Sequence, residues 1–530
     1  MESAIKSIVP INESKKKDNS RAVIDELSVN ELVFAVVGPA GSGTSWVANA
    51  LCEQAKKIRN KVEVKVIKGS SVIKDWAEKK DKQLLVTGNS LDRARNLQDL
   101  GDEIRKDDVA GVAVQLISEI RKSRQLYDGE NSFNKDVFRV YVLDSLKHPA
   151  EVELLRRVYR EAFCLVGVVC ETEQRLRRLK DSKCEDSGQT EIKKFIARDE
   201  DSGTKYGQKV AETFHLADFF VDNTPARFLD SEKKNENPLW DVNDQLGRLF
   251  DILTHAKLVR PKPNEIGMFH AYGAQLRSAC LSRQVGAALT DSFGNLLSTG
   301  TNEVPRAGGG VYGSVLTNFD DEDDRDHRCA YSGGYCRNTK TGIEIIEELV
   351  DAIPELKTVD RDALQKKLKN TSLGRLLEFS RAVHAEMDAI LSATRQGASP
   401  VGGRLFVTTF PCHYCARHIV SAGIDEVQYI EPYPKSRALA LHGDAIVQSP
   451  DGWLAPSSSS KSDDKKRSVL FRPFTGVAPR MYRTAFLKDR KLKNEEGTMK
   501  IGKPEWASGL LRKSYKDVEA ALLGEQGNGQ

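Results

Sequence analysis

Long apolar runs are what this sequence of 530 residues lacks most plainly. No segment approaches the roughly 20 consecutive apolar residues that cross a bilayer, so we expect no membrane-spanning helix. The opening residues, MESAIKSIVPINESKKKDNS, carry no apolar core like that of a secretory signal. We therefore expect a cytoplasmic protein in a reducing compartment, without a membrane partner.

An excess of one charge is also missing, because the net charge is only +4 over the whole chain. That balance neither demands nor excludes a nucleic-acid partner. Internal repeats are absent from the sequence as well. The length exceeds what one hydrophobic core normally organises, so we expect more than one domain.

Cysteine is sparse, with nine residues in the chain. Four of them are scattered and lie mostly in apolar segments, where we expect small buried side chains: Cys52, Cys164, Cys170 and Cys184. The other five lie in the C-terminal half: Cys280, Cys329, Cys336, Cys412 and Cys415. The last two form Cys-x-x-Cys, which in a reducing compartment indicates metal or redox chemistry before a structural disulfide.

The first half alternates short apolar runs with helical patterns. We expect strands at 33–37, 62–67, 137–143 and 164–169. Strands of this kind separated by helices predict a parallel sheet covered on both faces, hence an α/β fold. We assign residues 1–28 to a mobile leader and 29–255 to this first domain.

The second half begins after a linker that contains Pro261 and Pro263. We expect a second domain at 264–490 and a tail at 491–530. Its expected elements are a helix at 265–282, a hairpin around the turn 291–295, a helix near 372–396, a strand at 405–408, a helix from 411 and a strand at 427–430. Two charged or low-complexity inserts, 320–326 and 457–466, are expected to be exposed loops.

The strongest motif combines VHAEMDAIL with FPCHYC, and so gives His384-x-Glu386 followed by Pro-Cys412-x-x-Cys415. This combination is typical of zinc deaminases. One imidazole and two thiolates provide three ligands for tetrahedral Zn²⁺ and leave one position open for water, as catalytic sites require. We expect Glu386 beside that open position, where it moves protons during catalysis.

Helix starts support this placement. Pro411 suits the first turn of a helix, which would put both cysteines near its N-terminus, where the partial positive charge favours thiolate. The alternatives are a redox pair for Cys-x-x-Cys and an ordinary surface pattern for His-x-Glu. His413 and His418, which flank the thiolates, are expected to pack around the site or lie at the surface.

Here the chain resembles the deoxycytidylate deaminases. The resemblance rests on CLSRQVGAAL and STGTNEVP together with the zinc motif, and it covers about residues 265–445. It implies a cytidine-deaminase-like α/β/α sandwich with a mixed sheet. It also implies that Asn302 contacts the substrate sugar or base, that Tyr433 contacts the base or phosphate, and that Lys435 contacts the phosphate. Tyr433 has rim packing as its alternative.

The segment HRCAYSGGYCR raises a second metal question. His327, Cys329 and Cys336 are candidates for a second, structural zinc, with Cys280 or a later histidine completing it. Some relatives of the resembling family carry such a site. Free thiols in an ordered insert are the alternative.

A glycine loop, GPAGSGTS, follows the first expected strand. Its amides and the helix start after it suit phosphate binding by Gly38, Gly41, Ser42, Gly43, Thr44 and Ser45. The residue where a phosphate-binding lysine belongs is Thr44, so we expect nucleotide binding without efficient phosphoryl transfer. Ser45 is placed to reach Mg²⁺, and Asp144 is either an acidic partner of that ion or a helix cap.

The first half resembles nucleoside and nucleoside-monophosphate kinases. The whole chain is similar to bacterial anti-phage deoxycytidylate deaminases of the AvcD type, a degenerate P-loop kinase-like domain fused to a dCMP-deaminase domain. That resemblance implies conversion of dCMP or dCTP to uracil nucleotides, which depletes the pool that phage replication needs. It also implies silencing by a small regulatory RNA and a homo-oligomer. We expect an NTP or dNTP at the glycine loop to gate the deaminase.

Two other functions remain open. A nucleic-acid editing deaminase shares the zinc chemistry but needs a basic groove with stacking aromatic residues. The basic stretches 472–483 and 488–493 are peripheral, and they fit a solvated tail or an RNA docking site equally well. The third reading is a nucleotide-sensing scaffold without activity, against which the intact zinc motif argues.

Overall fold

The computed structural model describes residues 28–58, 62–85, 90–128, 138–183, 188–230, 232, 234–255, 257–313, 327–369, 371, 379–433, 436–459, 466–488, 493–499 and 510–511. The expected leader, apart from residue 28, lies outside these residues, as do the insert 320–326 and residues 460–465. Contacts divide the chain into two units. In the described part of the chain, no helix combines the length and the apolar character needed to cross a bilayer.

The first unit comprises Met1–Ala217, Asn223–Leu258 and Lys491–Gln530. Its described elements are β1 (Ser28–Val29), β2 (Glu31–Val37), α2 (Thr44–Ile58), β3 (Val62–Lys68), α3 (Gly69–Lys79), α4 (Ser90–Asp107), α5 (Gly111–Asp128), β4 (Phe138–Asp144), α6 (Pro149–Tyr159), η1 (Arg160–Ala162), β5 (Phe163–Val169), α7 (Thr172–Lys183), α8 (Gln189–Glu200), α9 (Val210–Phe214), α10 (Val242–Leu253) and β14 (Leu510–Leu511). The short strands β1 and β14 pair antiparallel.

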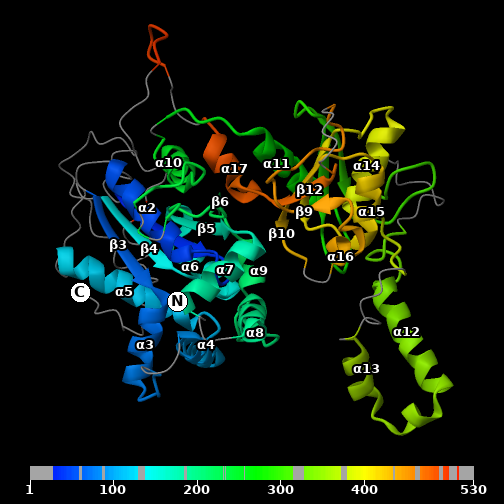
Figure 1. Cartoon of the computed structure of the whole chain (residues 1–530), viewed down its shortest axis with the longest axis horizontal. Coiled ribbons are helices and arrows are strands. Elements are labelled where there is room, and N and C mark those ends of the chain that lie inside the picture. The colour runs from blue at the N-terminus through cyan, green and yellow to red at the C-terminus, as the bar shows by residue number, and fades with distance from the viewer. Residues whose placement is uncertain are drawn as a thin grey trace, which may run out of the picture. The chain divides into compact units, whose positions relative to one another are not determined.

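Parallel strands form the centre of this unit, in the order β5-β2-β4-β3 (Figure 1). Every residue of β2, β4 and β5 is buried, which explains why these strands read as continuous apolar runs rather than alternating ones. Helix α2 packs on β3 and β4, and α10 packs against α2. The parallel sheet expected from the sequence is confirmed.

The second unit comprises Asp218–Asp222 and Val259–Arg490. Its described elements are β6 (Phe219–Asp222), α11 (Pro263–Gln275), β7 (Gly286–Thr290), β8 (Leu296–Thr301), α12 (Arg337–Ala352), η3 (Pro354–Thr358), α13 (Arg361–Lys369), α14 (Ala385–Arg395), β9 (Arg404–Thr409), α15 (His413–Ser421), β10 (Glu426–Glu431), α16 (Ala438–His442), β11 (Ile446–Val447), β12 (Val469–Pro473), β13 (Gly476–Val477) and α17 (Pro479–Phe486). Strands β6 and β13 pair antiparallel.

A mixed sheet in the order β11-β12-β10-β9-β7-β8 forms the core of this unit. Strand β7 runs antiparallel to both of its neighbours, and the other pairs are parallel. A Cβ on Gly286 would lie 2.0 Å from the Ala271 carbonyl of α11, and one on Gly300 would lie 2.1 Å from the Ala385 carbonyl of α14. Because these glycines face opposite sides of the β7–β8 hairpin, helices cover both faces of the sheet, as the sequence predicted.

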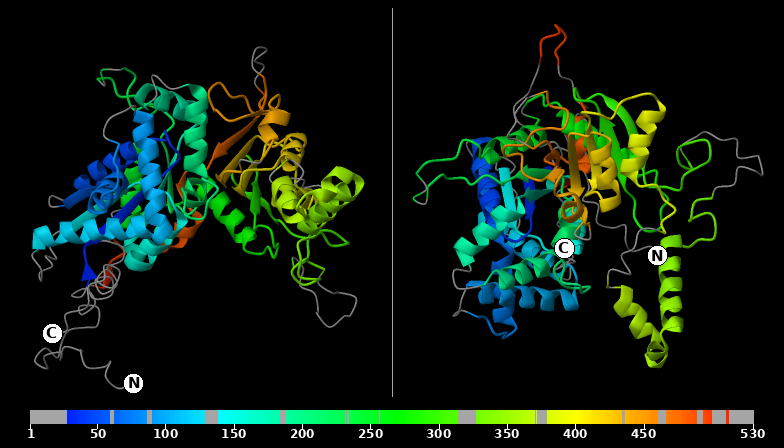
Figure 2. Two further views of the ribbon diagram at one scale, coloured as in Figure 1. Left: turned by 90° about the horizontal axis from the view of Figure 1, so that it is seen from below. Right: turned by 45° about the vertical axis from the view of Figure 1, so that its right-hand side comes forward.

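A pair of helices, α12 and α13, extends from this unit beyond its sheet (Figure 2). They precede α14 in the chain, and residues 372–378 of the connection lie outside the described part. The zinc motif itself lies at the starts of α14 and α15, and the first residues of α12, Arg337 and Asn338, line the cavity beside it.

Two predicted helices were too long. The helix expected at 265–282 ends at Gln275, because Ser278 Oγ donates to the Asn302 carbonyl and the Ala279 amide donates to Glu303. Of the helix expected near 372–396, residues 372–378 lie outside the described part, and residues 379–384 are not helical, since Val383 forms an antiparallel bridge with Glu303 and α14 begins at Ala385. In both places, residues that were expected on a helix instead form part of the wall of the cavity beside the zinc motif.

Candidate metal centre and glycine loop

The three predicted zinc ligands meet at two helix starts. His384 is the N-cap residue of α14, Cys412 is the N-cap residue of α15, and Cys415 lies in the first turn of α15. Nδ1 of His384 lies 3.3 Å from Cys412 Sγ and 3.4 Å from Cys415 Sγ. Ligands at 2.0–2.3 Å around a tetrahedral ion lie roughly 3.5 Å apart, so this spacing fits zinc.

Local backbone contacts set these positions. The bridge between Val383 and Glu303 fixes the chain just before His384, through an amide–carbonyl pair at 2.9 and 3.1 Å. Pro411 was expected inside the first turn of the helix, but it precedes the N-cap residue Cys412. Its carbonyl accepts from Ser436 Oγ at 2.7 Å, which ties the turn before α15 to the segment before α16.

Protons are unevenly shared among the three ligands. A hydrogen bond from Cys415, acting against burial, lowers the pKa of Cys412 to about 4. The hydrogen bond with Cys412 raises the pKa of His384 to about 9, and it raises the pKa of Cys415 well above its ordinary value. One thiolate is therefore present before any cation binds. Two sulfurs and an imidazole nitrogen are donors that zinc accepts.

Glu386 lies in the first turn of α14 and is only 4% exposed. Burial and, to a smaller extent, the charge of Cys412 raise its pKa to about 7, although His384 opposes the shift. A carboxyl group with such a pKa exchanges protons readily near neutral pH. Glu386 thus lies close enough to the ligand cluster to interact with Cys412 and His384, and its catalytic role stays a prediction.

A cavity of about 210 Å³ opens onto these groups. His384, Glu386 and Cys412 lie in its wall, together with the predicted substrate residues Asn302 and Tyr433. Its wall also contains three arginines, three further cysteines and apolar side chains: Arg283, Arg337, Arg381, Cys280, Cys329, Cys336, Val285, Val304 and Phe410. The site thus combines a metal-ligand cluster, a buried carboxyl group and cationic side chains.

Comparison with known proteins agrees with this geometry. The family model described as the cytidine and deoxycytidylate deaminase zinc-binding region matches residues 262–431. The deoxycytidylate deaminases of Enterobacteria phages T2 and T4 are each 32% identical, over 169 and 171 residues. Each match spans 32% of this chain, and it covers 79% and 77% of the phage proteins, respectively. The chain belongs to the deoxycytidylate deaminase family.

A dCMP deaminase from cyanophage S-TIM5, solved in complex with dCMP and dUMP, is among the structures that match. It is 20% identical, and the match covers 34% of this chain and 91% of that chain with a TM-score of 0.21. The family assignment therefore rests on the sequence matches.

The deaminase-family resemblance predicted substrate contacts for Asn302, Tyr433 and Lys435. Asn302 is 7% exposed and already hydrogen-bonded: Nδ2 donates to the Arg283 carbonyl at 2.7 Å, and Oδ1 accepts from the Val285 amide at 2.8 Å. The Arg283 guanidinium lies 5.8 Å from the centre of the Tyr433 ring. Lys435 lies outside the described residues. The substrate contacts stay predictions.

The predicted second zinc site is not assembled. Cys280, Cys329 and Cys336 line one cavity, yet among the described residues no three ligand atoms from these cysteines and His327 come within 4.8 Å of one another. Cys336 Sγ lies 3.1 Å from Ser282 Oγ instead. Hydrogen bonds of this kind lower the pKa of Cys336, although burial opposes them. The second zinc stays a prediction.

Several positioning residues escaped the sequence analysis. The buried Glu303 accepts from the Ala279 amide at 2.7 Å and the Val304 amide at 3.0 Å, and so shapes the cavity wall. The buried Asp388 accepts from the Thr301 amide at 3.0 Å and ties α14 to β8. Asp388 follows Glu386 by two residues, so the motif itself contains this acidic side chain. Its hydrogen-bond partner, the Thr301 amide, could not be predicted from the motif.

The glycine loop of the first unit has the geometry of an anion cradle. Gly41 and Gly43 have φ values of +85° and +84°, which favour glycine. Among the described residues, no acceptor takes the amides of Gly41, Gly43, Thr44 or Ser45. Ser45 Oγ donates to Asp144 at 2.6 Å, so the two groups proposed to hold Mg²⁺ are adjacent.

Carbonyl contacts lock the loop in place. The Ser42 carbonyl accepts from Asn223 Nδ2 at 2.8 Å and from Arg178 at 3.3 Å. Asn223 Oδ1 in turn accepts from the Trp240 indole at 2.9 Å. Gly38, Gly41, Gly43, Thr44 and Ser45 line a cavity of about 910 Å³. Thr44 is its one predicted departure from a phosphate-transferring loop.

Proposed function

We propose that the chain is a zinc-dependent deaminase that converts dCMP, dCTP or both to dUMP or dUTP and ammonia. The observation that carries this proposal is the placement of Nδ1 of His384 within 3.4 Å of two cysteine sulfurs, beside a buried Glu386. The family assignment and the names of the phage relatives support the same substrate class.

His384, Cys412 and Cys415 would hold the zinc. When bound, the ion supplies Lewis acidity that makes water a nucleophile near neutral pH. Glu386 then acts as the proton carrier: its carboxylate takes a proton from water and passes it to N3 of the cytosine ring. It next takes the proton of the hydroxyl group now bonded to C4 and gives it to the amine, which leaves as ammonia while the C4 carbonyl forms. Burial keeps bulk water from competing for that proton, because the side chain is 4% exposed.

The cavity wall favours a phosphorylated substrate over a free nucleoside. Arg283, Arg337 and Arg381 line a cavity that also contains apolar walls, with Arg283 paired to Glu431 and Arg381 donating to the His327 carbonyl. Guanidinium groups bind phosphate through paired, charge-assisted hydrogen bonds. A deoxycytidine base between Val304 and Phe410 with its phosphate toward the arginines satisfies both kinds of wall.

A second role belongs to the glycine loop. An NTP or dNTP, with Mg²⁺ between Ser45 and Asp144, binds there and gates the deaminase. The free amides of the loop and the Ser45–Asp144 contact support this regulatory site. The P-loop kinase-like identity of the first unit rests on its parallel sheet and on the resemblance of its loop.

The cellular role follows from the resemblance to anti-phage deaminases of the AvcD type. Conversion of deoxycytidine nucleotides to uracil nucleotides depletes a pool that phage replication requires. A small regulatory RNA keeps the cytoplasmic homo-oligomer inactive before infection. Infection of cells that carry the wild-type gene or Glu386→Gln, with dCTP and dUTP measured over time, tests this role.

One assay tests the activity. Purified protein is incubated separately with dCMP, dCTP, CMP and single-stranded DNA, and ammonia and uracil products are measured. Turnover of dCMP or dCTP that Glu386→Gln abolishes supports the proposal. Turnover of DNA alone would identify an editing enzyme, and no turnover in zinc-loaded protein would identify a nucleotide-sensing scaffold.

A further inference from the structure

The cavity beside the glycine loop contains more cations than its motif suggests. It measures about 910 Å³, within the range of small-molecule sites. Arg105, Lys147 and Arg178 lie in its wall, and so do four carboxylates, Asp144, Asp181, Asp199 and Asp230. Three positive and four negative groups repel a polyphosphate, so the available cations decide whether one binds.

Both arginines are committed to the protein. Arg178 donates to the carbonyls of Ser42, Asn223, Thr224 and Pro225, which fastens the loop. Arg105 is 2% exposed, and it donates to Glu151 at 2.8 Å and to Asp102 at 3.4 Å. These guanidinium groups hold the cavity together and have few donors left for a ligand.

Lys147 differs from both of them. It is the only lysine among the described residues that line the cavity, and its ammonium donates to Asp199 Oδ1 at 2.9 Å. Asp199 Oδ2 accepts from the Ala40 amide of the glycine loop at 2.8 Å. One carboxylate thus bridges a loop amide and the lysine. A phosphate oxygen bound to a P-loop accepts the same two kinds of donor.

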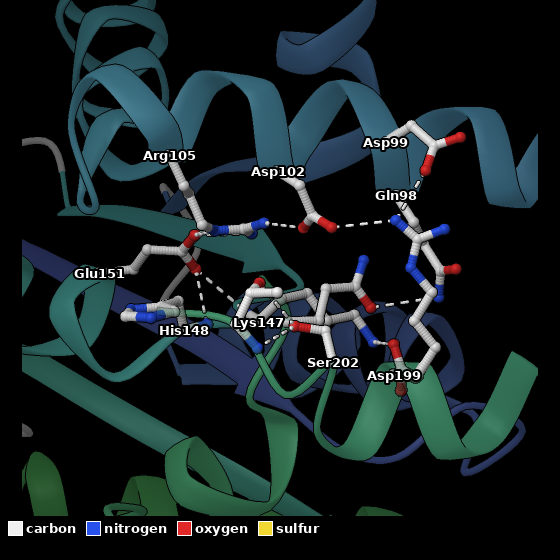
Figure 3. A network of polar contacts seen from close by, with 12 residues as sticks. Gln98, Asp99, Asp102, Arg105, Lys147, His148, Glu151, Asp199 and Ser202 are labelled. Atoms are coloured by element: carbon white, nitrogen blue, oxygen red, sulfur yellow. Dashed lines mark hydrogen bonds and ion pairs between the residues drawn. The ribbon is translucent and has the colours of Figure 1, made fainter. Parts of the chain in front are cut away.

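A buried network holds Lys147 in this place (Figure 3). The Glu151 carboxylate accepts from the Lys147 amide at 2.9 Å while Arg105 neutralises it. Figure 3 shows Lys147, Asp199 and Gln98 with this network. Glu151 of α6 and the Lys209 amide fix the Lys147 backbone, and its ammonium is already held by Asp199, so a change of partner costs little additional side-chain freedom.

Unpaired polar atoms mark the same cavity independently. Gln98 is 5% exposed and lines the cavity, yet its Oε1 has no hydrogen-bond partner among the described residues. The Ser42 hydroxyl is also fully buried without a partner among the described residues; Ser42 does not line the cavity, but it lies between Gly41 and Gly43, which do. Buried polar groups left unpaired cost stability, so they point to a ligand that completes them.

We propose that Lys147 supplies the cation that the loop lacks, by exchanging Asp199 for an outer phosphate of a nucleoside triphosphate. The proposal rests on the nucleotide site proposed above and names its phosphate-binding residue. Asp199 acts as an internal anion that occupies the Ala40 amide and Lys147 until the nucleotide arrives. Removing Lys147 therefore weakens binding more as the ligand gains phosphates, and removing the charge of Asp199 strengthens it.

Calorimetric titration of the zinc-loaded full chain tests this exchange, with ATP, ADP, AMP, dCTP and inorganic triphosphate as probes, each with Mg²⁺. We expect Lys147→Gln to weaken the tightest triphosphate about 10- to 100-fold, the range for one charged hydrogen bond, with a smaller loss for its monophosphate. Lys147→Arg should restore most of the affinity, and Asp199→Asn should raise it several-fold. The matched control is Lys209→Gln, because Lys209 pairs with Glu212 at 3.1 Å and does not line the cavity.

Distinct outcomes separate this inference from the nucleotide site itself. If wild type binds triphosphate and Gly43→Asp abolishes binding while Lys147→Gln does not change it, the site stands and the role of Lys147 is wrong. An equal loss for mono- and triphosphates in a folded Lys147→Gln also overturns the role. If wild type binds none of the probes, both proposals fall. Thermal unfolding of each variant confirms that the fold persists.

Discussion

The two units carry sites that differ in completeness. In the second unit, the ligands His384, Cys412 and Cys415 and the carboxyl group of Glu386 come from two short motifs, and they converge at two helix starts. In the first unit, the glycine loop is formed but Thr44 replaces the lysine. A short sequence motif therefore indicates a site when it contains every charged group that the site needs. A charged group that comes from a distant part of the chain is recognised only in the folded structure.

The largest effect is expected from a substitution in the metal centre of the second unit. Glu386→Gln should lower kcat for dCMP about 1000-fold, because a positioned proton carrier contributes 10²–10⁴-fold. Zinc content should not change, since Glu386 is not a ligand. The control is Glu344→Gln, an exposed change on α12. Ammonia release measured for both variants checks this, and a Glu386→Gln enzyme with more than a tenth of wild-type kcat contradicts it.

Removing a ligand should empty the same site. Cys415→Ser is expected to weaken zinc binding by more than about 100-fold. The reason is that even residues that only hydrogen-bond to the metal ligands contribute 10–100-fold to metal affinity. Metal analysis after dialysis measures it, with Cys52→Ser on α2 as the control. Retention of full zinc in Cys415→Ser would show that another group holds the ion.

The same experiment addresses the second zinc. A wild-type chain with two zinc ions and a Cys329→Ser chain with one would establish the second site. Equal zinc content in the two proteins would contradict the prediction of a second zinc site that includes Cys329. Cys329 lines the cavity without gathering other ligand atoms, so its loss leaves the first site intact.

Zinc affinity should also depend steeply on pH. With pKa values of about 9 for His384 and about 4 for Cys412, the metal-free site between pH 6 and 8 holds imidazolium and one thiolate. The raised pKa of Cys415 keeps that thiol protonated. Zinc needs neutral imidazole and two thiolates, so binding releases two protons, and affinity should rise up to about 100-fold per pH unit. Competition with a chelator at pH 6, 7 and 8 measures the slope, and a flat profile contradicts it.

The smallest effect concerns the incomplete site. A Cβ on Gly43 would lie 2.4 Å from Asn223 Nδ2, at a φ of +84°. Gly43→Ala should lower the free energy of unfolding by about 2 kcal/mol or more, from conformational strain and crowding, and abolish nucleotide binding. Gly203→Ala isolates the strain, because Gly203 has a φ of +72° and no atom within 4 Å of its Cβ position. Equal denaturant midpoints for the two variants would show that the Asn223 side chain moves away from the new methyl group without a loss of stability.

Particular elements show how far sequence reasoning reached. Strand β2 was predicted at 33–37 and is found at Glu31–Val37, because a strand buried on both faces reads as one apolar run. The convergence of His384, Cys412 and Cys415 was predictable, because tetrahedral zinc restricts the residue types and spacings that can bind it. The end of α11 at Gln275 was not, since it depends on Glu303, which lies 24 residues beyond Ala279.

Polar pairs distant in the chain account for the other omissions. The substrate contact of Asn302 stays a prediction, but the sequence did not indicate that its amide group also bonds to the backbone of Arg283 and Val285. The Lys147–Asp199 pair joins residues 52 positions apart, and no local periodicity marks such a contact. Only the packing of complete elements brings these groups together.

Zinc-edge anomalous diffraction from crystals of Glu386→Gln soaked with dCMP tests the central claim most directly. We predict an anomalous peak held by His384 Nδ1 and the sulfurs of Cys412 and Cys415, with no fourth protein ligand and with the cytosine ring beside residue 386. A peak with four protein ligands, or no peak among these three residues, would contradict the claim.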